Sequence, residues 1–233
     1  MDDAVIVPVY NEVEFVEPVL DRLREVWQGE ILVVDDGSTD GSTEYLTTRD
    51  DILVIPHPEN LGYGKSLIDG IAFARFAGIR RVVTMDADGQ HRPEDVPRFF
   101  ETLDLGVDFV SGSRYRPDSH VTSSAPEERQ HINHVLTEEI DRATDYDITD
   151  AFCGMKAYQL NVFDKIHLTE PGYAVCVEFW AKAHQAGLTM VELPVERIYV
   201  DLHRSFGPEL DDPERRLAYY LDAWNRATAL DEA

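Results

Sequence analysis

The sequence predicts an α/β fold with a mostly parallel, twisted sheet and helices on both of its faces. One reason is that short apolar runs alternate with amphipathic stretches, as strands and crossover helices do in such sheets. A second reason is that three apolar runs in the first 90 residues end in acidic or polar turns, which is typical of parallel strands that open toward a ligand. With 233 residues, the chain suits a single domain over 1–233, because two compact domains would be cramped.

The individual elements follow from the apolar runs and from the turn residues that separate them. Strands are expected near 3–9, 30–35, 52–55, 81–86, 107–111 and 155–159, followed by an extended stretch over 188–200 that is broken at Pro194. Helices are expected near 12–27, 41–48, 64–77, 94–103, 127–143 and 174–187.

Two further segments stand out after the first half of the chain. Residues 116–124 contain Pro, Asp, Ser and Thr without periodicity, so we expect a mobile loop there. Near the end, Leu217, Tyr220, Leu221 and Trp224 keep the spacing of one face of a helix. We expect this C-terminal helix to pack on the body of the protein, on a partner or on a bilayer surface.

Composition narrows the class of protein. Lys and Arg number 21 against 45 Asp and Glu, which gives a net charge of −24 and argues against nucleic-acid binding. The two cysteines, Cys153 and Cys176, have no metal-ligand spacing and are expected as reduced thiols. The acidic start does not resemble a signal peptide, and no run of 18 apolar residues occurs. We therefore expect a cytoplasmic protein without a transmembrane segment.

The most informative segment is the apolar run Val82–Met85, which ends in Asp86 and Asp88. On an extended backbone these two carboxylates point the same way. They can share a hard divalent cation such as Mg²⁺ or Mn²⁺ and leave its other positions for phosphate oxygens. The alternative is an acidic turn after a strand, but the runs that end at Glu12 and at Asp36 favour a ligand site.

Five ordered motifs carry a resemblance to a known family. They read VPVYNE (7–12), VVDDGSTDGS (33–42), NLGYGKSLIDGI (60–71), MDADGQHRPED (85–95) and SGSRY (111–115). Together they resemble the family 2 glycosyltransferases of GT-A (nucleotide-diphospho-sugar transferase) fold, and more narrowly the dolichyl-phosphate mannose synthase and polyprenyl-phosphate glycosyltransferase branch. The match is specific over about 3–115 and looser beyond. It implies a nucleotide-sugar-binding half over 1–115 and an acceptor-side half over 116–233.

The resemblance implies roles for several residues on the donor side. Asp86 and Asp88 would hold Mg²⁺ or Mn²⁺, with Gln90 as a further oxygen ligand or else a solvated turn residue. Lys65 would open a helix that borders the donor site, since Glu59 rules out a Walker loop. Four positions match those around the nucleobase and ribose, although the last could instead cap a helix; they are Pro8, Tyr10, Glu12 and Asp36.

On the acceptor side, a lipid phosphate needs cations to position it, whereas a hydroxyl needs a general base. The resemblance implies that Arg114, Arg129 and Arg204 contact an acceptor phosphate. It also implies a catalytic-site role for Asp150, in a segment that resembles Asp-x-x-Ser-Gly-Phe. For a soluble hydroxyl acceptor, Asp150 or Glu178 would be the base.

The sequence departs from this branch in three ways. The lysine of its Arg-x-x-Gly-x-Ser-Lys motif is missing after His203 and Arg204, Asn133 replaces a serine, and the membrane helices of many relatives are absent. His131 and His134 share a helical face without a third metal ligand, and the role of His91 stays open.

The expected activity is that of an inverting, metal-dependent glycosyltransferase. It would move mannose or glucose from a GDP- or UDP-sugar to a polyprenyl or dolichyl phosphate. The alternatives are transfer to a soluble hydroxyl acceptor and a non-catalytic nucleotide-sugar-binding protein. With a lipid acceptor, the protein could also associate peripherally with the inner face of the membrane or with a membrane partner.

Overall fold

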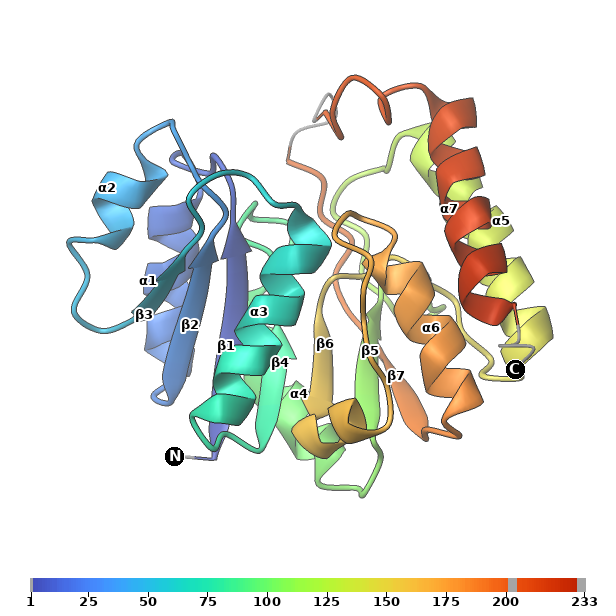
Figure 1. Ribbon diagram of the computed structural model, residues 1–233, viewed down its shortest axis with the longest axis horizontal. Helices are drawn as coiled ribbons and strands as arrows, with labels where there is room; N and C mark the ends of the chain where they lie inside the picture. The colour runs from blue at the N-terminus through green and yellow to red at the C-terminus, as the bar shows by residue number, and fades with distance from the viewer. Residues whose placement is uncertain (1, 201–204, 230–233) are drawn as a thin grey trace.

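A computed structural model describes residues 2–200 and 205–229, which form a seven-stranded sheet of order β3-β2-β1-β4-β6-β5-β7 (Figure 1). The strands are β1 (Asp3–Val9), β2 (Glu30–Asp35), β3 (Leu53–Pro56), β4 (Arg81–Thr84), β5 (Phe109–Ser113), β6 (Lys156–Gln159) and β7 (Met190–Pro194). All neighbouring pairs are parallel except those of β6, which runs antiparallel to both β4 and β5. The predicted mostly parallel sheet is thus confirmed.

The central strands are buried on both faces, which is why they read as continuous apolar runs. Ala4 and Ile6 of β1 belong to the core on one side of the sheet, whereas Val5 and Val7 belong to the core on the other. This alternation follows from the two-residue period of a strand. The sheet therefore separates two apolar cores, and each must be covered by helices.

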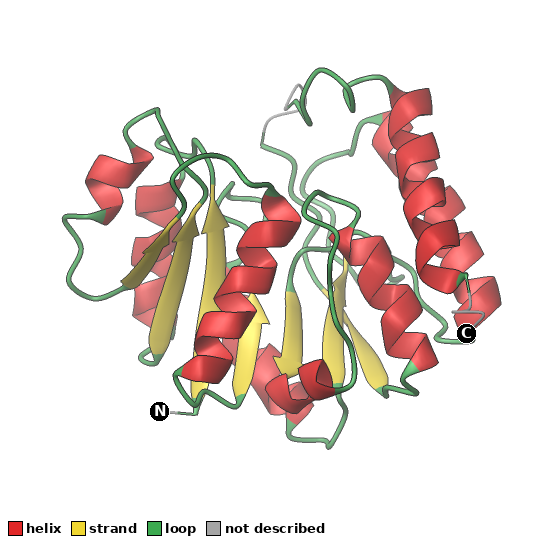
Figure 2. Cartoon of the chain, in the orientation of Figure 1, coloured by secondary structure: helices red, strands yellow, loops and turns green. Residues whose placement is uncertain are grey.

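Helices cover both faces, as the sequence predicts (Figure 2). One core includes side chains of α1 (Val16–Val26), α2 (Ser42–Leu46) and α4 (Val96–Leu103). The other includes those of α3 (Tyr63–Phe76), α5 (Glu127–Thr144), α6 (Val175–Gln185) and α7 (Pro213–Thr228). There are two short 3₁₀ helices in the described ranges: η1 (Pro93–Asp95) precedes α4, and η2 (Leu160–Asp164) follows β6.

The C-terminal helix α7 packs on the body of the protein, beside α5 and α6. Tyr220 and Trp224 of its apolar stripe are buried there. Asp212 caps the helix by accepting the N–H of Arg215 at 2.9 Å. Of the three expected surroundings for this stripe, the structure therefore shows the first.

The remaining differences from the predicted elements are small. The helix expected from residue 12 begins at Val16, because residues 12–15 form a turn in which Glu12 accepts the N–H of Phe15. Residues 116–124 contain no helix or strand, as expected, and their one bridge joins Val121 to Arg197. Within the described ranges, no helix has both the length and the apolar character needed to cross a membrane.

Helix α3 approaches the sheet closely at Gly70. A Cβ atom at this position would lie 2.7 Å from Cγ2 of Ile6 and 3.2 Å from Cγ2 of Val34. We expect Gly70→Val to lower the free energy of unfolding by about 2 kcal/mol, since overpacking a core costs about 1–3 kcal/mol. The measurement is equilibrium unfolding in urea.

The control is Ala72→Val, which places the same side chain on the exposed face of α3. Its cost should stay below about 0.7 kcal/mol, the range of helix propensities. Equal losses in the two variants would contradict this account of Gly70.

Candidate active site

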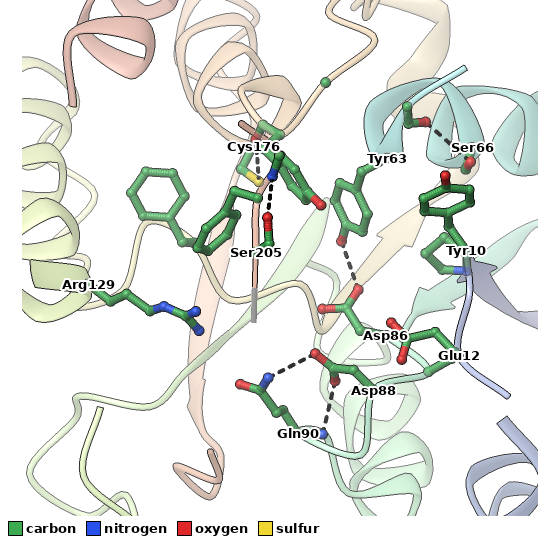
Figure 3. A pocket seen from close by; sticks show the side chains of 18 of the residues that line it. Tyr10, Glu12, Tyr63, Ser66, Asp86, Asp88, Gln90, Arg129, Cys176 and Ser205 are labelled. Carbon is green, nitrogen blue, oxygen red and sulfur yellow. Dashed lines mark hydrogen bonds between the residues drawn. The ribbon is translucent and has the colours of Figure 1, made fainter. Parts of the chain in front are cut away.

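The carboxyl ends of β1, β2, β4 and β5 border one large cavity of about 920 Å³. The parallel register brings these ends together, with Val9 beside Asp35 and Ile6 beside Thr84. Figure 3 shows Asp86, Asp88 and Gln90 in this cavity, with Tyr10 and Glu12 on one side and Arg129 on the other. The cavity thus joins an acidic region to a basic one.

Most of the predicted donor-side residues line the cavity; these are Pro8, Tyr10, Glu12, Asp36, Asp86, Asp88 and Gln90. Tyr10 is 45% exposed, so part of its ring is open to solvent. The turn after β1 is fixed by its neighbour: Asn11 adopts a left-handed φ of 55° and accepts the N–H of Thr39 at 2.8 Å. Glu12 donates its own N–H to Ser42 Oγ at 3.0 Å.

Asp36 lies at the cavity but is already engaged by the protein. Its carboxylate accepts the N–H groups of Leu61 and Gly62 at 2.8 and 2.9 Å, and it lies 2.7 Å from Nδ1 of His57. Asp36 therefore does not cap the helix after β2, as the alternative had it; it holds the turn before α3. A role toward a nucleobase stays a prediction.

Asp86 and Asp88 are held in place by their neighbours. The Tyr63 hydroxyl donates to Asp86 Oδ1 at 2.9 Å, and Gln90 donates its N–H and its side-chain amide to Asp88, each at 3.0 Å (Figure 3). Buried His91 lies outside the cavity lining. Its Nδ1 accepts the N–H of Asp86 at 3.1 Å, so His91 stabilises this turn.

The oxygen donors at this turn suit a hard divalent cation. In the described ranges, no group of three or more His, Cys, Asp or Glu side chains could hold a metal. An ion bound by Asp86, Asp88 and the Gln90 amide oxygen would therefore complete its shell with a substrate or water, as Mg²⁺ usually does. Gly154 leaves room for the Asp86 carboxylate, because a Cβ atom at position 154 would lie only 2.5 Å from Asp86 Oδ2.

On the basic side, Arg114 lines the cavity and forms a buried ion pair with Asp150. Nε and Nη2 of Arg114 lie 2.7 and 2.9 Å from the Asp150 carboxylate, which also accepts the Arg114 N–H at 3.0 Å. Burial opposes the charged form of Asp150, but the charge of Arg114 outweighs it and holds the pKa of Asp150 below its usual value.

Asp150 itself is 0% exposed and does not line the cavity. Glu178 also lies outside the lining and accepts the N–H groups of Thr169 and Glu170 together with Lys182 Nζ. Both carboxylates are buried, are engaged by other groups and lie outside the cavity lining, which disfavours either of them as a base for an acceptor hydroxyl. Asp150 instead positions Arg114.

The other predicted residues are placed as follows. Arg129 and Asn133 of α5 both line the cavity, whereas His131 and His134 are exposed elsewhere on the same helix. Lys65 does not line the cavity; its Nζ lies 2.6 Å from Asp69 within α3. Arg204 lies outside the described residues.

Sequence reasoning missed several polar residues of the cavity lining, among them Tyr63 and Arg216. Tyr63 lies within the NLGYGKS motif, where an aromatic ring between two glycines was a usable signal. Arg216 gave no such signal, because it is the second of two arginines on an amphipathic helix and only the packing of α7 brings it to the cavity.

The ion pair gives a stability prediction. Removing one partner of a buried pair typically costs about 3–5 kcal/mol, so Asp150→Asn should lower the free energy of unfolding by at least about 3 kcal/mol near neutral pH. Because the folded-state pKa of Asp150 is lowered, its contribution is present in full above about pH 4, the usual Asp pKa. It declines as the pH falls from there through the folded-state pKa.

The measurement is denaturant unfolding of parent and variant between pH 3 and pH 7, with exposed Asp147→Asn as control. The control should match the parent to within about 0.5 kcal/mol, as surface changes usually do. A similarly small effect of Asp150→Asn at neutral pH would contradict the structural role of the pair.

Comparison with known proteins gives consistent matches. Residues 4–167 match the family model described as Glycosyl transferase family 2. Polyprenol monophosphomannose synthase of Mycolicibacterium smegmatis is 32% identical over 200 residues, which cover 82% of this chain and 75% of that protein. Undecaprenyl-phosphate mannosyltransferase of Micrococcus luteus is 31% identical over 208 residues, or 86% of this chain and 85% of that protein.

A solved structure matches nearly the whole chain. It is glucosyl-3-phosphoglycerate synthase from Mycobacterium tuberculosis, in complex with Mn²⁺, uridine diphosphate and glucosyl-3-phosphoglycerate. The TM-score is 0.73 over 99% of this chain and 81% of that chain, at 19% sequence identity. This likeness confirms the predicted GT-A fold.

Proposed function

Because this chain belongs to glycosyl transferase family 2, we propose that it moves mannose or glucose from a GDP- or UDP-sugar to a polyprenyl or dolichyl phosphate. The family and the two mannosyl-transferring relatives make the chain a hexosyltransferase. We propose, in addition, the identity of the donor, the acceptor and the metal, and a reaction that inverts the configuration of the anomeric carbon.

One observation carries the choice of acceptor: the chemical difference between the two sides of the cavity. The described lining residues from position 114 onward include Arg114, Arg129 and Arg216. No Asp or Glu is among the described lining residues of this part of the chain. The same part of the lining is rich in aromatic rings, namely Tyr115, Phe152, Tyr173, Tyr199, Phe206 and Tyr220. Cations amid apolar surface suit a phosphate group attached to an isoprenoid chain.

The reaction with such an acceptor needs no general base. An oxygen of the acceptor phosphate attacks the anomeric carbon while the bond from this carbon to the donor diphosphate breaks. The nucleoside diphosphate leaves on the opposite face, which inverts the configuration, and no proton has to be removed from the acceptor. The buried positions of Asp150 and Glu178 agree with this course and disfavour a hydroxyl acceptor.

On the donor side, we assign the diphosphate to the turn that carries Asp86, Asp88 and Gln90. These side chains would hold Mg²⁺ or Mn²⁺, which supplies positive charge for the leaving diphosphate. Tyr10 would stack on the nucleobase, and Pro8, Glu12 and Asp36 would surround the base and ribose. The lipid acceptor would require peripheral association with a membrane surface.

The relatives' names agree with this assignment. One transfers mannose to polyprenol phosphate according to its name, and the other to undecaprenyl phosphate. Because both share about a third of their residues with this chain over most of its length, we extend the acceptor class to it.

The metal site can be tested with Asp88→Asn. The variant should bind Mn²⁺ at least roughly tenfold more weakly, since it loses a charged oxygen ligand of an ion that prefers carboxylates. Calorimetric titration in the presence of GDP or UDP measures this, and the melting temperature should stay unchanged. Asp118→Asn, in the loop after β5, is the control. Equal Mn²⁺ affinity in both variants would refute the assignment of Asp88.

The acceptor is tested by kinetics with a polyprenyl phosphate. A hydrogen bond to a charged group contributes about 1.5–3 kcal/mol, so Arg129→Ala should raise the KM for the acceptor by at least about tenfold. Arg142→Ala on the same helix, paired with Glu139 at the surface, should have no effect. The proposed function fails if the parent enzyme does not use polyprenyl phosphate with any GDP- or UDP-hexose.

A further inference from the structure

Arg216, in the first turn of α7, is a buried cation that forms no ion pair with any residue in the described ranges. It lines the cavity, and only 4% of the residue is exposed. Its Nη1 donates to the Leu210 carbonyl at 3.0 Å, while Nη2 is buried and has no hydrogen-bond partner among the described residues. A buried guanidinium that lacks a compensating charge is costly. An anion in the cavity would supply the partner that Nη2 lacks.

Arg114 provides a contrast within the same cavity. Its Nε and Nη2 are both taken up by the Asp150 carboxylate, so its charge is already neutralised. In the described ranges, Arg216 forms no ion pair of this kind. Arg216 is thus better prepared than Arg114 to accept a new negative charge.

Arg216 also lies close to a second cation. The guanidinium carbons of Arg216 and Arg129 are 4.5 and 4.8 Å from the centre of the same Phe206 ring. Burial and, to a lesser extent, the charge of Arg129 lower the pKa of Arg216 below its usual value, although Tyr220, Glu128 and Asp211 act in the opposite direction. Like charges around one ring repel, and a dianion between them would turn this repulsion into attraction.

The surroundings define the chemical class of the anion. A phosphate monoester carries a charge between −1.5 and −2 near pH 7 and offers several acceptor oxygens for guanidinium groups. Aromatic rings adjoin the two arginines, with Tyr173 5.4 Å and edge-on from Phe206, and Tyr220 4.5 Å from Phe152. An isoprenoid chain could lie on these rings.

We propose that Arg216 binds the phosphate of the acceptor together with Arg129 and thereby positions the attacking oxygen. This inference rests on the proposed function, and it assigns to α7 a substrate-binding residue that the sequence motifs do not contain. It also accounts for one departure from the branch. Leu210, six residues after Arg204, stands where Arg-x-x-Gly-x-Ser-Lys has its lysine, and Arg216 reaches the carbonyl of that residue.

The test uses Arg216→Met, which keeps an unbranched side chain of similar length but removes the charge, and Arg216→Lys, which retains a charge. Binding to the 233-residue protein is measured by calorimetry with farnesyl phosphate and with inorganic phosphate. Arg216→Met should weaken farnesyl phosphate binding by at least about tenfold, the effect expected for one charge-assisted contact. Arg216→Lys should restore part of the loss, and Arg215→Met, on the exposed side of α7, should bind like the parent.

Further readouts separate binding from a structural role. Replacing a buried, unpaired charge by an apolar side chain should leave the melting temperature of Arg216→Met equal or higher. The KM for the sugar donor should remain within about twofold of the parent, well below the tenfold effect that a lost charged contact would have. Tighter binding of farnesyl phosphate than of inorganic phosphate supports a lipid-linked anion, and equal binding argues against it.

Unchanged farnesyl phosphate binding in Arg216→Met would overturn the inference, as would a lower melting temperature with no change in binding. Neither result touches the proposed function, which depends on whether the parent enzyme transfers a hexose to polyprenyl phosphate. Conversely, if the parent makes no such product but Arg216→Met still loses affinity for farnesyl phosphate, only the assigned reaction fails.

Discussion

The buried ion pair between Arg114 and Asp150 is the interaction on which the rest of the site depends. A carboxylate in the protein interior has to be neutralised, so the end of β5 and the segment after residue 148 cannot move independently. The same segment packs against Asp86 at Gly154, where a side chain would not fit. Its Ala151 carbonyl accepts the indole N–H of Trp180 at 3.0 Å. One ion pair therefore joins Arg114, at the end of β5, to the segment that packs against Asp86.

The second constraint is electrostatic. The chain carries a net charge of −24, yet both proposed substrates are anions. Over distances beyond about 8–10 Å such repulsion is largely screened at physiological salt, whereas contacts inside a cavity act at short range and in a medium less polar than water. Local cations can thus outweigh the global charge. In the described part of the lining they come from α5 and α7, which bring Arg129 and Arg216 to the same Phe206 ring.

Particular residues show which features could be predicted from the sequence. The strands that end near Glu12, Asp36 and Asp86 were predictable, because an apolar run followed by a polar turn is a local pattern. The antiparallel direction of β6 was not, since Lys156–Gln159 is only a short extended segment whose partners lie far away in the chain. The contacts of Asp36 with Leu61 and Gly62 were equally hidden, as they join residues about 25 positions apart.

The sequence by itself determined the order of strands and helices, the family, and the acidic turn at Asp86 and Asp88, because these follow from periodicity and from motifs of adjacent residues. Only the tertiary structure decided which charged groups are available to a ligand. Asp150 and Arg216 are both charged residues in unremarkable contexts, yet Asp150 is neutralised by Arg114, whereas Arg216 lines the cavity and forms no ion pair within the part of the chain that the structure describes. That difference arises from the packing of β5, α5 and α7, because burial and pairing depend on neighbours distant in the chain.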